Sequence, residues 1–482
     1  MALPLPHAFP ALYYRTRNQM TGKDLIKLGF KPGPAIGVAL RLIDAAEKLP
    51  GKGELKRQLK AVLHDPAGNT SHPLFAEVAT TLIEQANRPA FVEREQPAPY
   101  QVWGENLDES ALDQMRAAVR LPVAVAGALM PDAHLGYGLP IGGVLATDNS
   151  VIPYAVGVDI ACRMKLSVFD LPADQMKRLN DTLIRALQRE TKFGMGAEFS
   201  KPLQHDVLDE DWSVTGITKH LFDKARAQLG TSGSGNHFVE FGILSLDKPD
   251  IGLEAGEYLA LLSHSGSRGA GATVASHYSR LAMDLHPELP QNLRHLAWLD
   301  LNTEPGQEYW AAMNLMGKYA AANHALIHQR VARAIGAHVI AGIENHHNFA
   351  WKETHGGREV IVHRKGATPA GTNVLGVIPG SMAAPGFVVR GKGKPESLES
   401  ASHGAGRQMS RTAAREKFRW AYVRPILEDA GVQLLSAGID EVPGAYKDIH
   451  TVMAAQSDLV EIVARFDPRI VKMADAGEKP ED

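Results

Sequence analysis

Residues 229–240 read Leu-Gly-Thr-Ser-Gly-Ser-Gly-Asn-His-Phe-Val-Glu, a run of glycine and serine that leads directly into an apolar segment. The first part is typical of a turn and the second of a strand. Successive side chains of a strand point to opposite faces. One face receives His237 and Val239, and the other receives Asn236, Phe238 and Glu240. One face is therefore suited to a metal ion and the other to a nucleotide base.

The same kind of pattern extends over most of the chain. From about Gln101 onward, short β-branched runs alternate with glycine-rich turns, and long helical segments are inserted between them. This mixture predicts an α+β fold. Within residues 307–335, a helical period places five side chains on one face that we expect in the core: Tyr309, Ala312, Met316, Tyr319 and Asn323.

The length of 482 residues exceeds what one hydrophobic core needs. We predict an N-terminal helical module and linker over residues 1–98 and a catalytic domain over residues 99–482. A turn at residues 31–34 interrupts helix-period apolar residues in the module: Leu25, Ile26, Leu28, Ile36, Leu40 and Ile43. Residues 29–37 fit either a helix-turn-helix packing element or a backbone that approaches a phosphate. The prolines of residues 88–100 are typical of a linker.

The overall charge does not indicate a protein coated in cations. The net charge is -3, and 22% of the residues are charged. Residues 388–424, here called the basic stretch, contain nine Lys or Arg and three Glu, a local net charge of +6. This stretch fits either a local nucleic-acid contact or a solvated helix face.

The single cysteine, Cys162, excludes an intramolecular disulfide and favours a reducing compartment. Residues 1–14 lack the basic and apolar regions of a secretory signal, and no segment reaches the roughly 18 apolar residues of a membrane span. We therefore predict a cytoplasmic protein with no membrane partner.

Residues 157–162 place Asp159 and Cys162 three positions apart, so that a carboxylate and a thiol can converge on one side of a turn. That arrangement suits metal binding, because a bound divalent ion deprotonates a coordinating thiol. A buried structural cysteine is the alternative, and this segment alone does not decide between the two.

Three further segments embed histidines among small or polar residues. They are Ser-His-Ser-Gly-Ser-Arg-Gly at 263–269, Asn-His-His-Asn at 345–348 and Ser-His-Gly-Ala-Gly-Arg at 402–407. Any one of the twenty histidines is weak evidence by itself. Together with Cys162 and Asp159, the histidines form a sulfur, nitrogen and oxygen donor set that suits manganese, zinc or iron. More donors than one tetrahedral ion needs imply two ions, which at about 3.5 to 4 Å apart can clamp a phosphoryl group.

These motifs resemble those of the RtcB RNA-splicing ligases over about residues 101–482. Nine stretches match in the family's order: residues 130–136, 157–162, 229–240, 264–269, 346–348, 364–367, 378–382, 402–407 and 445–448. The resemblance implies a single large RtcB-like catalytic domain, preceded by a module without a counterpart in the minimal family pattern.

The resemblance also implies roles for individual residues. The metal ligands are Asp159, Cys162, His237, His264 and His347, with Cys162 bridging two Mn²⁺ ions. His347 is chosen over His346 because the family's ligand directly precedes an asparagine. His403 is the nucleophile. The residues expected to hold the guanine nucleotide are Asn236, Phe238, Glu240, Asn348, Pro379, Gly380, Ser381, Met382, Gly404, Ala405, Gly406 and Lys447.

The implied activity is a GTP- and Mn²⁺-dependent RNA ligase. It joins a 2′,3′-cyclic phosphate or 3′-phosphate end to a 5′-hydroxyl end, through a histidine-GMP intermediate and a guanylylated RNA 3′ end. One alternative is a metal-dependent phosphodiesterase or 3′-capping enzyme that acts on RNA or DNA ends. Another is a non-catalytic RNA-binding protein, which the presence of both Cys162 and His403 disfavours.

Three positions depart from the family pattern. Arg163 follows Cys162 where the family usually has glycine, which places a bulky cation next to the expected metal centre. Residues 383–386 read Ala-Ala-Pro-Gly and lose a glycine and a serine hydroxyl expected near the base, and Pro369 replaces a small or basic residue. We expect these changes to affect nucleotide preference and end specificity more than the metal site.

Overall fold

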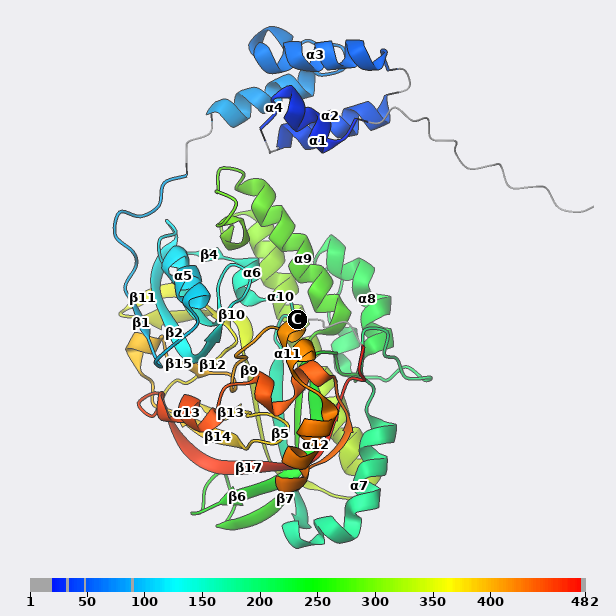
Figure 1. Ribbon diagram of the computed structural model, residues 1–482, viewed down its shortest axis with the longest axis vertical. Helices are drawn as coiled ribbons and strands as arrows, with labels where there is room; N and C mark the ends of the chain where they lie inside the picture. Colours follow the sequence, from blue (N-terminus) through cyan, green and yellow to red (C-terminus); the bar gives the residue numbers. More distant parts are fainter. Residues whose placement is uncertain (1–19, 32–33, 47–48, 88–90, 478–482) are drawn as a thin grey trace, which may run out of the picture. The chain divides into compact units, whose positions relative to one another are not determined.

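The computed structural model describes residues 20–31, 34–46, 49–87 and 91–477. The chain divides into two units, Met1–Phe91 and Val92–Asp482, each with its own elements (Figure 1). The start of the chain, residues 32–33 of the predicted turn and residues 88–90 of the predicted linker lie outside the described residues. None of the helices in the described ranges combines the length and apolar character that crossing a bilayer requires.

The first unit contains four α-helices over its described residues: α1 (Gly22–Leu28), α2 (Pro34–Ala45), α3 (Lys52–His64) and α4 (Ala76–Asn87). Thr21 begins α1 with a capping box, in which it exchanges hydrogen bonds with Asp24. The left-handed Gly29 ends the same helix. The apolar faces meet in a small core that includes the fully buried Leu25, Leu59 and Phe75.

Residues just after Phe91 hydrogen bond with the second unit. The amide of Arg94 donates to Arg120 O at 3.0 Å, and the amide of Ala98 donates to Val119 O at 2.8 Å. These backbone donors find partners in the second unit, so the part of the predicted linker from residue 92 onward is structurally part of that unit.

The second unit contains a five-stranded sheet with the order β1-β2-β3-β11-β10. Its strands are β1 (Tyr100–Val102), β2 (Ala124–His134), β3 (Ile141–Thr147), β10 (Asn348–His355) and β11 (Arg358–Lys365). β1 pairs parallel to β2, and the other pairs are antiparallel.

An eight-stranded sheet has the order β13-β14-β17-β6-β7-β5-β9, with β16 pairing to β17. Its strands are β5 (Arg163–Pro172), β6 (Phe238–Leu246), β7 (Gly256–Ser265), β9 (Val339–His346), β13 (Leu375–Ile378), β14 (Gly386–Gly391), β16 (Gln433–Ser436) and β17 (Val460–Met473). Two short sheets pair β4 (Ser150–Val151) with β8 (Leu299–Asp300), and β12 (Ala367–Pro369) with β15 (Ser400–Ser402).

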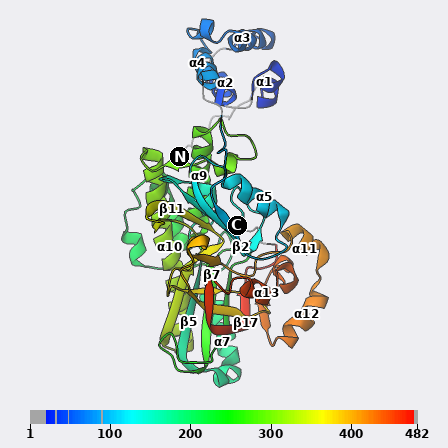
Figure 2. The ribbon, with the colours of Figure 1, turned by 90° about the vertical axis from the view of Figure 1, so that its left-hand side faces the viewer.

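The helices of this unit are α5 (Glu109–Ala118), α6 (Pro153–Val156), α7 (Met176–Glu190), α8 (Gly216–Gln228), α9 (Arg268–Leu285), α10 (Glu304–Ile335), α11 (Arg411–Lys417), α12 (Trp420–Asp429) and α13 (Ile449–Ala454). α10 runs alongside the larger sheet in both views (Figures 1 and 2). All five side chains predicted on its core face are buried, so that prediction is confirmed. Helices and mainly antiparallel sheets are mixed, and the predicted α+β class is confirmed for this unit.

Alternating side chains give the larger sheet two apolar faces. Val239, Phe241 and Leu261 lie on the face that packs against α7 and α10. Leu262 and Phe466 lie on the opposite face, in a separate core. Because both faces are buried, a one-residue slip in register would move apolar side chains to the wrong core.

Asn345, near the end of β9, links that strand to β13. Its side-chain oxygen accepts the amide hydrogen of Val377 at 2.8 Å, and its side-chain nitrogen donates to Thr368 Oγ1 at 2.7 Å. The side-chain amide thus replaces a backbone pairing between the two strands. The chain then passes from β9 into β10, so His347 lies where it crosses from the larger sheet to the smaller one.

We expect removal of residues 1–91 to leave the second unit folded, because its cores and all of its sheets lie after Phe91. The thermal unfolding midpoint and the bound metal of the truncated protein should match those of the full chain. Calorimetry and metal analysis of both proteins test this. An insoluble truncated protein, or one without a cooperative transition, would contradict it.

Candidate functional site

Four strands of the larger sheet, β5, β6, β7 and β9, begin or end along the same edge of the sheet. β5 begins directly after Cys162, β6 begins directly after His237, and His264 is the next-to-last residue of β7. In the register of the sheet, Phe238 pairs with His264, and Arg163 pairs with both Ser265 and His346. Hydrogen bonding between neighbouring strands therefore brings residues from distant parts of the sequence to one place.

Two groups of possible metal ligands form at this edge, and both contain Cys162. One group is Cys162, His264 and His347, and the other is Asp159, Cys162 and His237. Cys162 Sγ lies 3.1 Å from His264 Nε2 and 3.3 Å from His237 Nε2. His237 Nε2 in turn lies 3.1 Å from Asp159 Oδ2. The thiol thus stands between two sets of donors.

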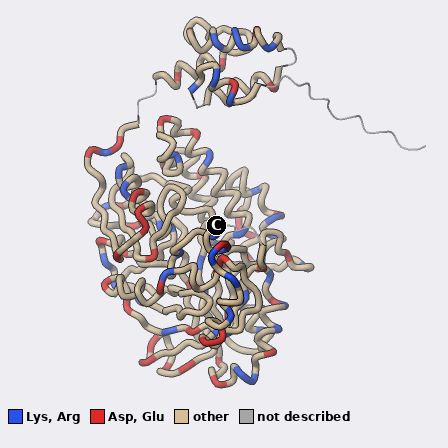
Figure 3. Tube along the Cα trace, in the orientation of Figure 1, with Lys and Arg blue, Asp and Glu red and all other residues tan. Residues whose placement is uncertain are grey.

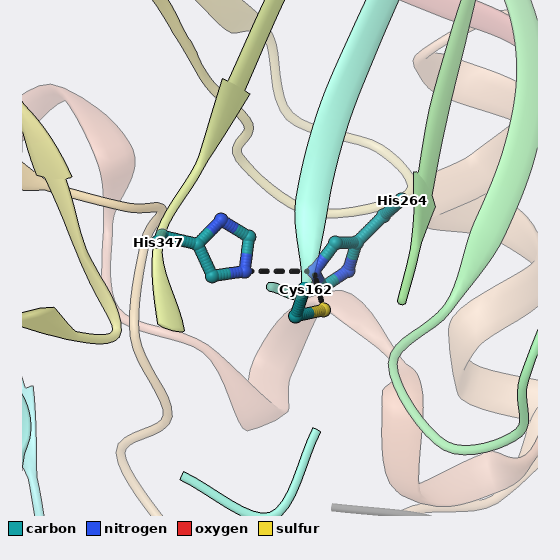
Figure 4. A group of neighbouring side chains, drawn as sticks. All are labelled: Cys162, His264 and His347. Atoms are coloured by element: carbon teal, nitrogen blue, oxygen red, sulfur yellow. Dashed lines mark hydrogen bonds between the residues drawn. The ribbon is translucent and has the colours of Figure 1, made fainter. Parts of the chain in front are cut away.

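Figure 4 shows the rings of His264 and His347 pointing toward one another beside the Cys162 thiol. The two Nε2 atoms are 3.1 Å apart. Burial lowers the pKa of both imidazoles well below its usual value, which favours their neutral forms. Neutral imidazole nitrogens and a thiolate are the donors that a borderline divalent ion prefers. The residues present therefore fit a metal centre.

The orientation of His264 supports this assignment. Its Nδ1 donates to Asn236 O at 3.2 Å, which leaves the lone pair on Nε2, the atom that faces Cys162. Metal-binding histidines commonly use their second nitrogen in this way. Asn236 itself lies directly before His237, so its backbone helps to position the ligands.

Asp159 is buried on the turn that precedes β5. Its carboxylate accepts a hydrogen bond from the Ser267 amide at 3.0 Å. Burial opposes its ionisation, but contact with His237 and hydrogen bonds outweigh burial and lower its pKa. The neighbouring Ala161 has a φ of 57°, and its amide donates to Asn348 O at 2.7 Å. This left-handed residue turns the chain so that Asp159 and Cys162 face the same centre.

His403 lies beside this centre and is held by Asp132. Its Nδ1 is 2.7 Å from Asp132 Oδ2, and the amides of His403 and Gly404 donate to the same oxygen at 3.2 and 3.3 Å. Asp132 is fully buried; its pKa is lowered because the hydrogen bond and charge of His403 outweigh the effect of burial. The ring centroids of His403 and His347 are 4.9 Å apart.

A cavity of about 630 Å³ opens above these residues. It is lined by His403, by the metal-site residues Asp159, His264 and His347, and by most of the residues expected to hold a nucleotide: Asn236, Phe238, Glu240, Asn348, Pro379, Gly380, Ser381, Met382, Gly404, Ala405 and Gly406. Phe238 and Glu240, on one face of β6, line it together with Asn236 from the turn before that strand. Burial raises the pKa of Glu240 well above its usual value.

Lys447 contacts the backbone on both sides of Asp132. Its ammonium donates to Pro131 O at 3.1 Å and to Ala133 O at 2.7 Å, the carbonyls on either side of Asp132. Lys447 is not among the residues that line the cavity in the described part of the chain. In this conformation it supports the strand that holds His403.

Comparison with known proteins identifies the family. A family model described as tRNA-splicing ligase RtcB matches residues 114–215 and 210–473. The RNA-splicing ligase RtcB of Escherichia coli K12 is 35% identical over 400 residues, which cover 76% of this chain and 95% of that protein. The chain belongs to the RtcB family. The tRNA-splicing ligase RtcB of Archaeoglobus fulgidus is 31% identical, with 75% of this chain and 90% of that protein covered. The RNA-splicing ligase RtcB of Mycobacterium tuberculosis H37Rv is 33% identical, with 70% and 94% covered.

The first unit lies outside the region that matches the RtcB family model, which begins at residue 114. The cluster of possible metal ligands, His403 and all the residues lining the cavity except Asp108 lie inside that region. Of the adjacent histidines of this RtcB protein, His347 joins the cluster. His346 instead packs its ring against Phe349 and Trp351, at centroid distances of 5.0 Å.

Asp132 is a site residue that the sequence analysis did not single out. The matching stretch 130–136 contains it, but its partner His403 is 271 positions away. A carboxylate inside an otherwise apolar strand was the available signal, because an acidic residue is rarely buried without a partner.

Arg163 directly follows Cys162, but its charge is paired. It is buried, forms an ion pair with Glu344 and donates to Gly317 O at 3.1 Å. Of the other two departures from the RtcB pattern, Ala384 lines the cavity and Pro369 pairs with Ser400 in a short sheet.

The basic stretch does not form an uninterrupted cationic surface. Asp440 and Glu441 lie against α11, where Arg407 pairs with Glu441, Arg411 with both acids, and Arg415 with Asp440. Basic and acidic residues are interspersed over the second unit (Figure 3). Asp440 and Glu441 therefore offset two of the six net positive charges, and Arg407 and Arg411 still line the cavity.

We expect metal content to depend on which donor group is lost. Cys162→Ala removes a ligand from both groups, so the variant should bind neither ion at a Mn²⁺ concentration that saturates the wild type, with affinity at least about 10-fold weaker. His347→Ala and His237→Ala each remove a ligand from one group and should each retain one ion. Mass spectrometry of the bound metal measures this.

The matched control is His346→Gln, since His346 is the partly buried neighbour that stays outside the cluster. It should retain both ions, and circular dichroism should show all four variants folded. A folded Cys162→Ala protein that keeps two ions would mean that Cys162 is a core residue and not a shared ligand.

Proposed function

We propose that this RtcB protein is a cytoplasmic GTP- and Mn²⁺-dependent RNA ligase. It joins a 2′,3′-cyclic phosphate or 3′-phosphate end to a 5′-hydroxyl end, in tRNA splicing or in repair of cleaved RNA. One observation carries the proposal: an imidazole held by a buried carboxylate faces a cavity that ends at a cluster of metal ligands. The names of its relatives support RNA as the substrate.

The imidazole of His403 is prepared for nucleophilic attack. Asp132 accepts the Nδ1 hydrogen, which leaves the lone pair on Nε2. Three hydrogen bonds fix the accepting oxygen of Asp132, so the ring orientation is fixed as well. This arrangement resembles the carboxylate that orients a catalytic histidine in other enzymes. A ligand histidine such as His347 cannot take this role, because a coordinated nitrogen has no lone pair available.

The turn after His403 provides access for a phosphate. Gly406 has a φ of 71°, and a Cβ at this position would lie 2.0 Å from Asp132 O. Any other residue would therefore collide with the strand that carries Asp132. Gly404 likewise adds no side chain beside the nucleophile, so an incoming phosphate can approach Nε2.

Two groups of donors that share Cys162 support the binding of two ions. Bound Mn²⁺ would neutralise charge on the phosphates and orient them. Asp159 and His237 would hold one ion, and His264 and His347 the other. The chain positions these ligands before an ion arrives, through the Ser267 amide on Asp159 and the Asn236 carbonyl on His264.

The proposed reaction has three transfers. His403 Nε2 attacks the α-phosphorus of GTP, forming a P–N bond while the bond to pyrophosphate breaks. The RNA 3′-phosphate, released from the cyclic phosphate by water where necessary, then attacks the same phosphorus, and the P–N bond breaks. Finally the 5′-hydroxyl oxygen attacks the RNA 3′-phosphate, GMP leaves and a 3′,5′ phosphodiester forms.

The guanine base fits the strand face that carries Asn236 and Glu240. Guanine presents an N1–H and an exocyclic amino group on one edge, and an ionised carboxylate can accept both hydrogens. Glu240 is buried at the cavity and raised in pKa by that burial, so a donor pair from a ligand would favour its ionised form.

His403→Gln should abolish both the guanylate adduct and RNA joining. Asp132→Asn should retain the adduct but form it roughly 10²- to 10⁴-fold more slowly, because an amide neither stabilises the developing imidazolium nor fixes its tautomer. Labelled GTP, peptide mapping and single-turnover kinetics measure these effects. Opening of a cyclic phosphate should survive in His403→Gln, since that step uses water.

An adduct on a lysine, or RNA sealing by His403→Gln, contradicts this mechanism. Cyclic-phosphate opening by a wild-type protein that never becomes guanylated would instead support the alternative, a phosphodiesterase or end-modifying enzyme on the same scaffold.

Glu240→Gln should weaken GTP binding by roughly 10- to 100-fold, the range expected for hydrogen bonds to a charged group. Binding of ATP, which lacks the guanine donor pair, should change little. Competition between the two nucleotides in the guanylylation reaction measures the preference, and bound metal serves as the control. An unchanged preference for GTP would place the base elsewhere in the cavity.

A further inference from the structure

An aromatic cluster lies at the rim of the cavity. Its central residue, Tyr137, lies on the loop between β2 and β3. Tyr137 lines the cavity, and its residue is 64% exposed. Its ring lies 5.8 Å from that of His295 in an edge-to-face arrangement and 6.4 Å from that of Tyr154. Tyr154 and His295 are also 4.7 Å apart. Two separate segments thus support one ring that remains largely open to solvent.

The backbone under Tyr137 is held in place from inside the protein. Gln114 donates to Gly136 O at 2.6 Å and accepts the Gly136 amide at 3.0 Å. Gly138 follows with a φ of 72°, and a Cβ there would lie 2.6 Å from His295 O. An exposed tyrosine on a mobile loop would need no explanation, but these contacts fix its position at the rim.

Lys365 adds a further contact from the catalytic side. Its ammonium donates to Tyr137 O at 2.5 Å, and burial lowers its pKa to about 7. The next residue, Gly366, lies so close to the nucleophile that a Cβ on it would be 3.1 Å from His403 Cε1. The Tyr137 loop is therefore linked directly to the segment that packs against His403.

The rim also carries apolar and cationic groups suited to a nucleotide. Leu135, beside Tyr137, is 56% exposed and lines the same cavity. Arg407 and Arg411 also belong to the cavity lining, where Arg407 pairs with Glu441 and Arg411 with Asp440 and Glu441. Proteins bind single-stranded nucleic acid by stacking its bases on open aromatic rings, while cations contact the backbone.

We propose that Tyr137 stacks on the base of an RNA nucleotide at the join, and so positions that RNA end beside His403. This inference rests on the proposed function and names the contact for its substrate. Tyr137 is a positioning residue for RNA and has no part in transfer of the guanylyl group. Because every base has an aromatic face, the contact should tolerate any terminal base.

The test uses the full chain and two single-stranded RNA oligonucleotides, one with a 5′-hydroxyl and one with a 3′-phosphate, each carrying 2-aminopurine at its terminal nucleotide. Stacking on Tyr137 should quench 2-aminopurine fluorescence on at least one of them. Tyr137→Ala should abolish the quenching and weaken that oligonucleotide's binding by roughly 5- to 100-fold. Tyr137→Phe, which keeps the ring and loses the hydroxyl, is the matched control and should bind as the wild type does.

A second perturbation separates stacking from a general structural effect. With an abasic terminal nucleotide, the wild type and Tyr137→Ala should bind equally weakly, since the base that contacts Tyr137 is already gone. Guanylylation from labelled GTP should be unchanged in Tyr137→Ala. Equal quenching and affinity for wild type and Tyr137→Ala, or loss of guanylylation in that variant, would overturn the inference.

The two proposals fail in different ways. If the wild type does not join RNA but quenching still depends on Tyr137, the ligase mechanism is wrong and the stacking site stands. If the wild type joins RNA and no binding effect follows removal of the ring, the stacking site is wrong and the ligase mechanism stands.

Discussion

The shared position of the Cys162 thiol constrains the rest of the site. Sγ stands between His264 and His237, at 3.1 and 3.3 Å, in a region where both imidazoles and the carboxylate of Asp159 are buried. Burying several such donors without partners is costly, and a pair of ions that shares the thiolate would satisfy them together. Strand register provides the arrangement, since β5, β6, β7 and β9 all begin or end at this edge. A shift in any one pairing would remove a ligand.

The two largest sheets of the second unit contribute different parts of the proposed chemistry. The proposed metal ligands lie at strand ends of the eight-stranded sheet, whereas β2 of the five-stranded sheet carries Asp132, which holds His403. His347 lies at the crossing between the sheets and is close to both His264 and His403. The proposed nucleophile therefore lies next to the proposed metal centre, with its Nδ1 held by Asp132.

The sequence was sufficient to predict the α+β class, the buried face of α10 and the common strand face of Phe238 and Glu240, since these follow from local periodicity; Asn236 lies in the turn before that strand. It was not sufficient for contacts that depend on distant pairing. The bond between Asp132 and His403 spans 271 positions, and local pattern carries no information about it. The basic stretch showed the same difficulty: its charge is partly offset by Asp440 and Glu441, which approach only in the folded chain. Arg163 is likewise paired with Glu344, a partner that strand register alone supplies.

The central claim is that one thiolate serves two metal ions. Anomalous diffraction from crystals of the Mn²⁺-loaded protein tests it most directly. The account predicts two manganese peaks about 3.5 to 4 Å apart. Cys162 Sγ should be bonded to both, with Asp159 and His237 on one ion and His264 and His347 on the other. A single peak, or two peaks of which only one is bonded to the sulfur, would contradict the account.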